Sequence, residues 1–193
     1  MTDTELSPST EGIVIDDRSP LFDTIGMFYK EFPSDLRQIR YFTLIIVQKS
    51  PPEFQEVNLL EQQIGEIIKN AIRHGNRHDR TKKVRAWYSF TDNEARLIVE
   101  DEGDGFHALE RWNEFLKERN RCFQRQDFER MAAYVSFRSE HSSDDDGGNA
   151  LFAAVEYWNG GVVFNERRNR IALRKIFARI APGIGIDAGQ GQS

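Results

Sequence analysis

Two short segments of the chain hold polar residues whose types and spacing suit chemistry on a charged ligand. Glu66 and Asn70 lie four positions apart in the segment EIIKN, a spacing that makes two side chains neighbours on one face of a helix. Asp101 opens the segment DEGDGF, which also holds Gly103 and Gly105. A carboxylate and an amide on one helix face can orient a proton transfer and a metal ion, and a carboxylate beside glycines can approach a flat ligand closely.

Each segment also has a simpler interpretation. A glutamate and an asparagine on a helix are ordinarily part of a solvated face, and Asp with Gly is the usual composition of a turn. A calcium loop of the EF type is a third alternative for the acidic segment, but it needs a glutamate at its twelfth position. The segment DEGDGFHALERW ends on Trp112 instead, so its spacing excludes that calcium loop.

The elements that must position these residues can be predicted from the spacing of apolar residues. Apolar residues recur at helical spacing over residues 57–71 until Gly75, which predicts a helix with Glu66 and Asn70 on its polar side. The segments KVRAWYSF and ARLIVED, joined by TDNE, predict an antiparallel strand pair. This pair delivers Asp101 at its end.

The rest of the chain completes an α/β pattern. GIVI and GMFYKEF have the composition of strands, and Ser34 is the expected N-cap of a helix over DLRQIRYFTLIIVQK. After Phe106, helical patterns near ALERWNEFLKERN and DFERMAAYVSF occupy a long insertion, NALFAAVEYW predicts a short helix, and GGVVFNERRNRIALRKIF predicts a closing strand pair. This order predicts an α/β fold in two layers, with helices on one face of a mixed, mostly antiparallel sheet.

Composition limits the partners and the compartment. The formal net charge of -5 and the pI of about 5.5 argue against nucleic acid and anionic membranes as partners, because these select a basic surface. Cys122 is the only cysteine, so no intramolecular disulfide can form and a cytoplasmic location is expected. We expect a single domain over residues 12–181, with loose polar or glycine-rich tails at 1–11 and 182–193.

Three segments, taken in order, resemble the conserved boxes of the GHKL ATPases. EIIKNAIRHGN resembles the N box, DEGDGF the first glycine box and GGNALF the second. The resemblance runs from about residue 28 to residue 177. It implies a two-layer sandwich of the Bergerat type, a long ATP lid at about residues 107–146, and ATP and Mg²⁺ as cofactors. More narrowly, NAIRHGN and the short chain resemble the anti-sigma-factor serine kinases of bacterial partner-switching pathways.

The resemblance, together with elementary chemistry, implies a role for each residue of the first two boxes. Asp101 accepts a hydrogen bond from the adenine amino group, and Gly103 and Gly105 let the backbone take positive φ and approach the base and the ribose. Asn70 supplies an oxygen to Mg²⁺. Glu66 orients or deprotonates the hydroxyl or water that attacks the γ-phosphate.

The second glycine box is expected to hold the phosphates. A helix start opened by glycines offers free N–H groups and a dipole that favours anions, and here its residues are Gly147, Gly148 and Asn149. Two features depart from the family pattern. Ala150 stands where the final glycine of the box is usual, and NERRNRIAL lacks the Gly-Thr pair that often opens the last strand.

The functional interpretation therefore keeps several alternatives. The intact pair of Glu66 and Asn70 favours an ATP-dependent serine protein kinase that phosphorylates a STAS-type anti-anti-sigma protein and sequesters a sigma factor. Ala150 favours a nucleotide-gated protein-binding module without phosphoryl transfer. An ATPase or a histidine-kinase catalytic fragment is disfavoured, because nothing upstream resembles a dimerising helical hairpin with a phosphorylatable histidine. The resemblance also implies a homodimer, and it implies partner docking on the first helix, where Arg37 and Arg40 are candidate contacts.

Overall fold

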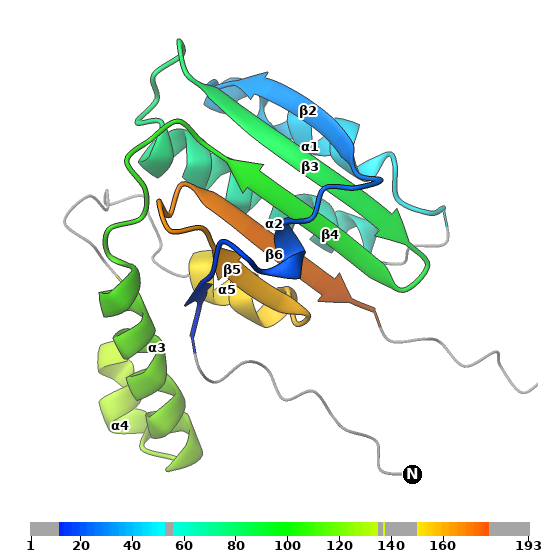
Figure 1. Cartoon of the computed structure of the whole chain (residues 1–193). Coiled ribbons are helices and arrows are strands. Elements are labelled where there is room, and N and C mark those ends of the chain that lie inside the picture. The colour runs from blue at the N-terminus through cyan, green and yellow to red at the C-terminus, as the bar shows by residue number, and fades with distance from the viewer. Residues whose placement is uncertain (1–11, 53–55, 135–136, 138–149, 178–193) are drawn as a thin grey trace, which may run out of the picture.

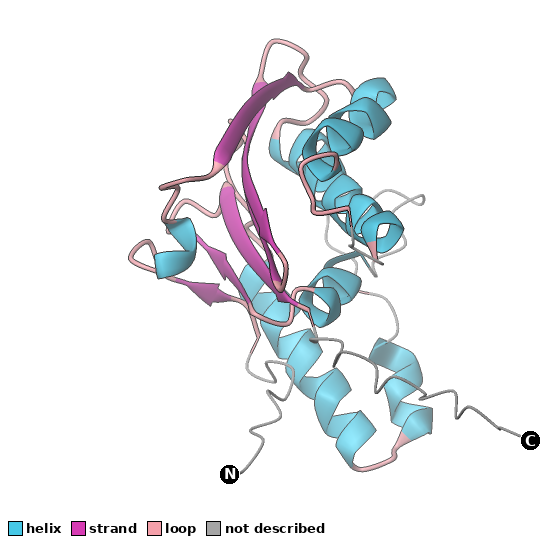
Figure 2. Ribbon diagram, turned by 90° about the vertical axis from the view of Figure 1, so that its right-hand side faces the viewer, coloured by secondary structure: helices cyan, strands magenta, loops and turns pink. Residues whose placement is uncertain are grey.

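The computed structural model of the chain describes residues 12–52, 56–134, 137 and 150–177. These residues form an open six-stranded sheet with helices packed on one face (Figures 1 and 2). The strand order is β1-β5-β6-β4-β3-β2; β1 and β5 are parallel, and the other neighbouring pairs are antiparallel. The two-layer α/β architecture expected from the sequence is confirmed. The strands are β1 (Val14–Ile15), β2 (Phe28–Pro33), β3 (Lys83–Thr91), β4 (Glu94–Glu100), β5 (Gly161–Phe164) and β6 (Arg170–Ile176).

Three helices cover one face of this sheet (Figure 2). They are α1 (Ile39–Val47), α2 (Val57–Asn70) and α5 (Ala150–Tyr157). Helix α2 continues into a π-helical turn, Ala71–Gly75, so the predicted helix ends at Gly75 but with a widened last turn. Among the residues that the structure describes, no helix is both long and apolar enough to cross a membrane.

The start of α1 differs from the expectation. A 3-10 turn, Leu36–Gln38, precedes the helix, and Asp35 caps this turn by accepting a hydrogen bond from the backbone N–H of Arg37 at 3.1 Å. Ser34 is buried, and its hydroxyl oxygen accepts a hydrogen bond from Asn76 Nδ2 at 2.7 Å. The prediction that Ser34 caps the helix was wrong, because the Ser34 hydroxyl is hydrogen-bonded to Asn76, a residue from a distant segment.

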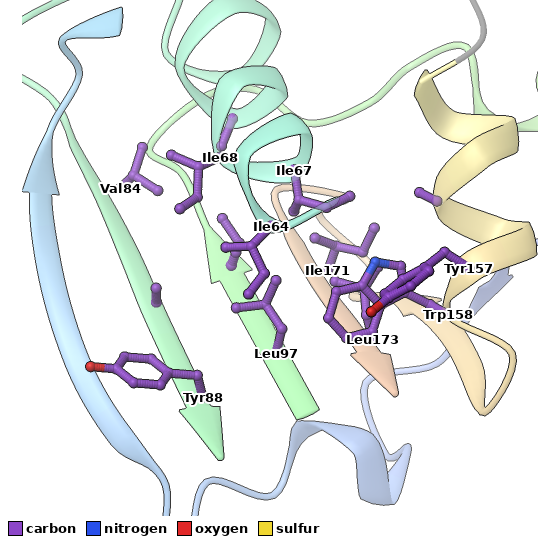
Figure 3. Close-up of a cluster of buried hydrophobic side chains, with 14 of the residues drawn as sticks. Ile64, Ile67, Ile68, Val84, Tyr88, Leu97, Tyr157, Trp158, Ile171 and Leu173 are labelled. Carbon is purple, nitrogen blue, oxygen red and sulfur yellow. The ribbon is translucent and has the colours of Figure 1, made fainter. Parts of the chain in front are cut away.

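The main core lies between α2, α5 and the sheet. Figure 3 shows Ile64, Ile67 and Ile68 on the side of α2 that faces the sheet, where Leu97 and Leu173 lie. These five side chains are all buried in one hydrophobic cluster. Burial of one such side chain stabilises a fold by about 1.5–3 kcal/mol, so the apolar face of α2 fixes which side of the helix remains for polar residues.

Part of the opposite face of the sheet is covered by an N-terminal strap, residues 16–25, which contains the 3-10 turn Pro20–Phe22. Ile98 and Ala172 face each other on β4 and β6 and are buried on this side. Arg96 Nη2 donates to the carbonyl oxygen of Asp23 at 2.7 Å and also reaches the carbonyls of residues 20 and 21 at 3.4 Å. The strap is therefore held on the sheet by hydrogen bonds from Arg96 to its backbone carbonyls as well as by apolar contact.

The insertion after Phe106 folds as a helical arm, residues 109–134. It consists of α3 (Leu109–Gln124), α4 (Phe128–Met131) and the 3-10 turn Ala132–Tyr134. Figures 1 and 2 show this arm projecting from the sheet domain. The helical patterns predicted here are confirmed; the predicted lid function and the tails at 1–11 and 182–193 remain predictions, because those tails and residues 138–146 lie outside the described residues.

Candidate nucleotide site

Helix α2 carries the first two predicted site residues on its polar side. Glu66 and Asn70 are partly exposed, whereas the apolar face of the same helix is buried. Both carboxylate oxygens of Glu66 lie close to Lys69 Nζ, at 3.2 and 3.3 Å. This half-exposed ion pair holds the carboxylate on the side of the helix that continues toward Asn70, as the sequence predicted.

Asp101 lies directly after β4, where the chain meets the end of α2. Figure 1 shows the ends of α2 and β4 on the same side of the domain. A Cβ added to Gly75 would lie 2.2 Å from Cγ of Asp101. The carboxyl group of Asp101 therefore packs directly on the backbone of the helix end, five residues after Asn70. Gly75, which sequence analysis treated only as a helix terminator, is required by this close approach.

Gly103 and Gly105 of the acidic segment are required by the structure for different reasons. Gly105 has φ +94°, and a Cβ there would lie 2.0 Å from the carbonyl oxygen of Arg167. Gly103 has no positive φ, so the conformational reason predicted for it was wrong. A Cβ on Gly103 would instead lie 2.1 Å from the carbonyl oxygen of Gly75, so this glycine lets the loop pack on the helix end.

The surroundings of Asp101 suit one additional hydrogen-bond donor. Its Oδ1 accepts the backbone N–H of Gly103 at 2.8 Å, while Oδ2 accepts no hydrogen bond from the residues that the structure describes. Burial raises the pKa of Asp101 to about 6, and the Gly103 N–H opposes this shift. A partly buried carboxylate with one oxygen that accepts no hydrogen bond fits an exocyclic amino group of a purine, which would supply the missing donor.

One buried residue that the sequence analysis missed joins the two halves of the site. Asn76 is fully buried, and its Nδ2 donates to Ser34 Oγ at 2.7 Å and to the carbonyl of Lys83 at 2.8 Å. Its Oδ1 accepts the backbone N–H of Glu102 at 2.7 Å. Asn76 thus fixes the loop that follows Asp101 to the chain that follows α2, and the final N of NAIRHGN is its only sequence signal.

The turn between β5 and β6 supports Asp101 from the other side. Asn169 is buried, its Nδ2 donates to the backbone carbonyl of Asp101 at 2.8 Å, and its own carbonyl accepts the Asp101 N–H at 2.9 Å. Asn165 Oδ1 accepts the backbone N–H groups of Asn169 and Arg170 at 3.1 and 3.0 Å. Asn165 and Asn169 lie just before the last strand, where the usual Gly-Thr pair is missing. Their hydrogen bonds hold the backbone of Asp101 in place of that pair.

The predicted phosphate-binding residues, Gly147, Gly148 and Asn149, lie outside the described residues. Their role remains a prediction, as does the contact of Asn70 with Mg²⁺. Within the described residues, the site consists of the loop that contains Asp101 and Gly103, packed on the end of α2.

Three features together define an ATPase fold of the GHKL type: an open, mostly antiparallel sheet, helices on one face of it, and a partly buried carboxylate at a strand end beside a helix that carries an acid and an amide. Residues 31–175 match the family model of the histidine kinase-like ATPase domain, and the chain belongs to that family. No curated protein matches the chain. Family membership implies ATP binding, usually with Mg²⁺, and indicates phosphotransfer or ATP hydrolysis as the class of reaction.

Adding a methyl group at Gly75 is expected to weaken ATP binding by at least about tenfold, because the new Cβ overlaps the carboxyl group of Asp101 and must displace it. Gly65→Ala is a matched control on the same helix, since its Cβ would lie 3.4 Å from Thr43 Cγ2, an ordinary contact. Isothermal titration calorimetry should show near-normal binding for Gly65→Ala. Normal ATP affinity in Gly75→Ala would contradict the close packing of Asp101 on the helix end.

ATP affinity is expected to fall as the pH drops through about 6. The pKa of Asp101 is raised to about 6 in the folded protein, so at pH 5 only about one molecule in ten keeps the carboxylate that accepts the purine amino group. The apparent Kd should therefore rise about tenfold between pH 7 and pH 5. Adenosine, which has no phosphate to titrate, should show the same dependence; a pH-independent adenosine Kd would exclude Asp101 as the titrating acceptor.

Proposed function

We propose that the chain is an ATP-dependent protein serine kinase of the anti-sigma type. In this proposal it phosphorylates a small STAS-type anti-anti-sigma protein and sequesters a sigma factor when that protein is phosphorylated. The observation that carries the proposal is the packing of the Asp101 loop on the end of the helix that bears Glu66 and Asn70. This packing puts the acceptor for the adenine base and the helix that carries the candidate general base, Glu66, on neighbouring parts of one site.

Glu66 is the candidate general base. Its carboxylate is partly exposed on the polar side of α2, and Lys69 is its ion-pair partner at 3.2 Å. Such a pair contributes about 0–1 kcal/mol when it is partly solvated, so it can open when a substrate hydroxyl approaches. Asn70, next to Lys69, is the candidate ligand for a Mg²⁺ ion that also binds the phosphates.

The outer side of α1 is the candidate surface for the partner proteins. Arg37 is largely exposed, but its guanidinium already donates to both carboxylate oxygens of Asp35, at 3.0 and 2.8 Å. Arg40 is exposed and has no ion pair among the described residues. It lies next to Tyr41, which is 62% exposed. Of the two predicted arginines, Arg40 is therefore the better candidate for contact with an acidic partner; a homodimer is part of the same proposal.

A second function keeps the nucleotide site but omits phosphoryl transfer. Two observations favour such a nucleotide-gated binding module. Ala150 stands at the usual glycine position of the second box, and the Glu66 carboxylate is engaged by Lys69. In this alternative, ATP changes the affinity for a partner and remains intact.

A pull-down with the full chain from the cytosol of its native cell tests the proposal. It is carried out with radiolabelled Mg-ATP and without nucleotide, and bound and phosphorylated proteins are identified by mass spectrometry. The kinase proposal expects label on a serine of one small partner and nucleotide-dependent retention of a second partner. Nucleotide-dependent retention without label supports the binding module, and no heat with Mg-ATP in calorimetry contradicts both functions.

A further inference from the structure

The helical arm, residues 109–134, is firmly anchored at its base. Asn113 exchanges two hydrogen bonds of 2.9 Å with the backbone N–H and carbonyl of Ile13. Arg168, in the turn between β5 and β6, forms an ion pair with Glu110 in the first turn of α3. Trp112 is 1% exposed. These contacts fix the direction of α3 relative to the sheet.

Beyond its base, the arm has an apolar interior of its own. Leu116 and Cys122 are buried, and the ring of Phe115 packs edge-on against Tyr134 and Phe137 with centroids 5.1 and 5.4 Å apart. Helix α3 has 16 residues and is about 24 Å long at 1.5 Å per residue. The arm therefore presents its far end at a defined position away from the sheet domain.

The far end of the arm, residues 119–130, exposes two large aromatic side chains in an ordered turn. Phe123 and Phe128 are 67% and 61% exposed. The turn between them is closed by a hydrogen bond from the backbone N–H of Asp127 to the carbonyl of Cys122 at 3.0 Å. Asp127 also caps α4 by accepting the N–H of Arg130 at 3.0 Å. The exposure of these rings is thus built into the turn.

The charge of this end is opposite to that of the rest of the chain. Residues 119–130 contain four arginines and two acids, a formal charge of +2, whereas the whole chain carries -5, which leaves -7 on the remainder. Arg125 has no ion pair among the described residues. Arg121 and Arg130 both form ion pairs with one acid, Glu118. Arginine and phenylalanine together are enriched in the cores of protein interfaces.

We propose that the end of the helical arm, residues 119–130, is a docking surface for an acidic, partly apolar surface of a partner protein. The guanidinium fork of Arg125 matches a carboxylate in a planar two-point contact, and the two rings supply the apolar area. Asp127 and Glu129 flank Phe128 and would repel the phosphates of a membrane or a nucleic acid. This surface lies away from the candidate site on α1, and it does not depend on phosphoryl transfer.

Site-specific photo-crosslinking in the native cell tests this surface. A photoreactive phenylalanine analogue replaces Gln124, which is exposed between the two rings, and in a second sample it replaces Asp92 in the turn between β3 and β4. The expected result is one protein crosslinked from position 124 and absent from position 92, with the contacted segment rich in Asp or Glu. Recovery of no protein, or the same proteins from both positions, overturns the proposal.

Purified variants then test the chemistry with the crosslinked protein. Phe123→Ser combined with Phe128→Ser should weaken binding by at least about tenfold, whereas Ile25→Ser, which alters an 86% exposed residue on the strap, should not. Arg125→Glu should also weaken binding, and exchange of the contacted acid for arginine in the partner should restore it. Unchanged affinity in both arm variants overturns the proposal. So does crosslinking to a second copy of this chain alone, or binding to phosphatidylserine vesicles that is lost in Arg125→Glu.

Discussion

Asp101→Asn is expected to weaken ATP binding by roughly tenfold to more than a hundredfold while leaving the fold intact. Oδ1 of Asp101 accepts the Gly103 N–H, and the amide oxygen of asparagine can keep this hydrogen bond. The new NH₂ group then occupies the position of Oδ2, where it faces the amino group of adenine, donor against donor. A hydrogen bond to a charged group contributes about 1.5–3 kcal/mol, so the loss is roughly tenfold to more than a hundredfold in Kd.

The stability of this variant distinguishes loss of the site from loss of the fold. Burial raises the pKa of Asp101 in the folded protein above its ordinary value. Its contribution to stability is therefore complete below pH 4 and declines as the pH rises through about 6. At neutral pH the amide avoids this cost, so Asp101→Asn should unfold at the same Tm as the native chain or higher. A normal calorimetric ATP affinity in this variant would remove Asp101 from the site.

Glu66→Ala is expected to reduce phosphoryl transfer by about two to four orders of magnitude, which is the usual contribution of a general base. ATP affinity should change little, because Glu66 is assigned to the attacking hydroxyl and not to the nucleotide. Initial rates of radiolabel transfer to the serine partner, together with ATP titrations, measure both quantities. The ion pair with Lys69 is half-exposed, so its loss should not unfold the chain.

Glu61→Ala provides the matched control for this experiment. Glu61 is partly buried on the same helix and has no role in the proposed site. Its replacement should leave both transfer and ATP binding unchanged. An unchanged transfer rate in Glu66→Ala would exclude Glu66 as the base. If no partner is phosphorylated, the nucleotide-gated binding module predicts that Asp101→Asn abolishes ATP-dependent partner binding and that Glu66→Ala does not.

The local elements of the fold could be predicted because their signals lie in short stretches of sequence. The apolar spacing over residues 57–71 predicts both α2 and its buried face, and the segment TDNE marks the turn between β3 and β4. Glu66 and Asn70 follow from the same spacing, since the buried side of the helix determines its polar side. The position of Asp101 at a strand end follows from the strand pair.

The residues that join these elements could not be predicted in the same way. Asn76 contacts Ser34, Lys83 and Glu102, three residues in separate segments, and no local pattern relates them. The contact between Asn76 and Ser34 also explains why Asp35, and not Ser34, is the N-cap. From the sequence, Gly75 could be identified only as a helix terminator, because the carboxyl group that packs on it belongs to Asp101, in the loop after β4. Polar side chains that connect distant segments become visible only when the fold brings those segments together.

The pairing of β1 with β5 has a consequence for the way the chain folds. Val14 lies opposite Val163, and the backbone N–H of Glu166 donates to Asp17 at 3.0 Å. During synthesis the N-terminal strap therefore leaves the ribosome long before the strand that fixes it exists. Such non-local contacts slow folding. Until β5 has been synthesised, the strap is not fixed to the sheet, so the face that contains Ile98 is only partly covered. Nascent chains halted before residue 161 are expected to bind chaperones at this uncovered face and to release them once the last two strands are complete.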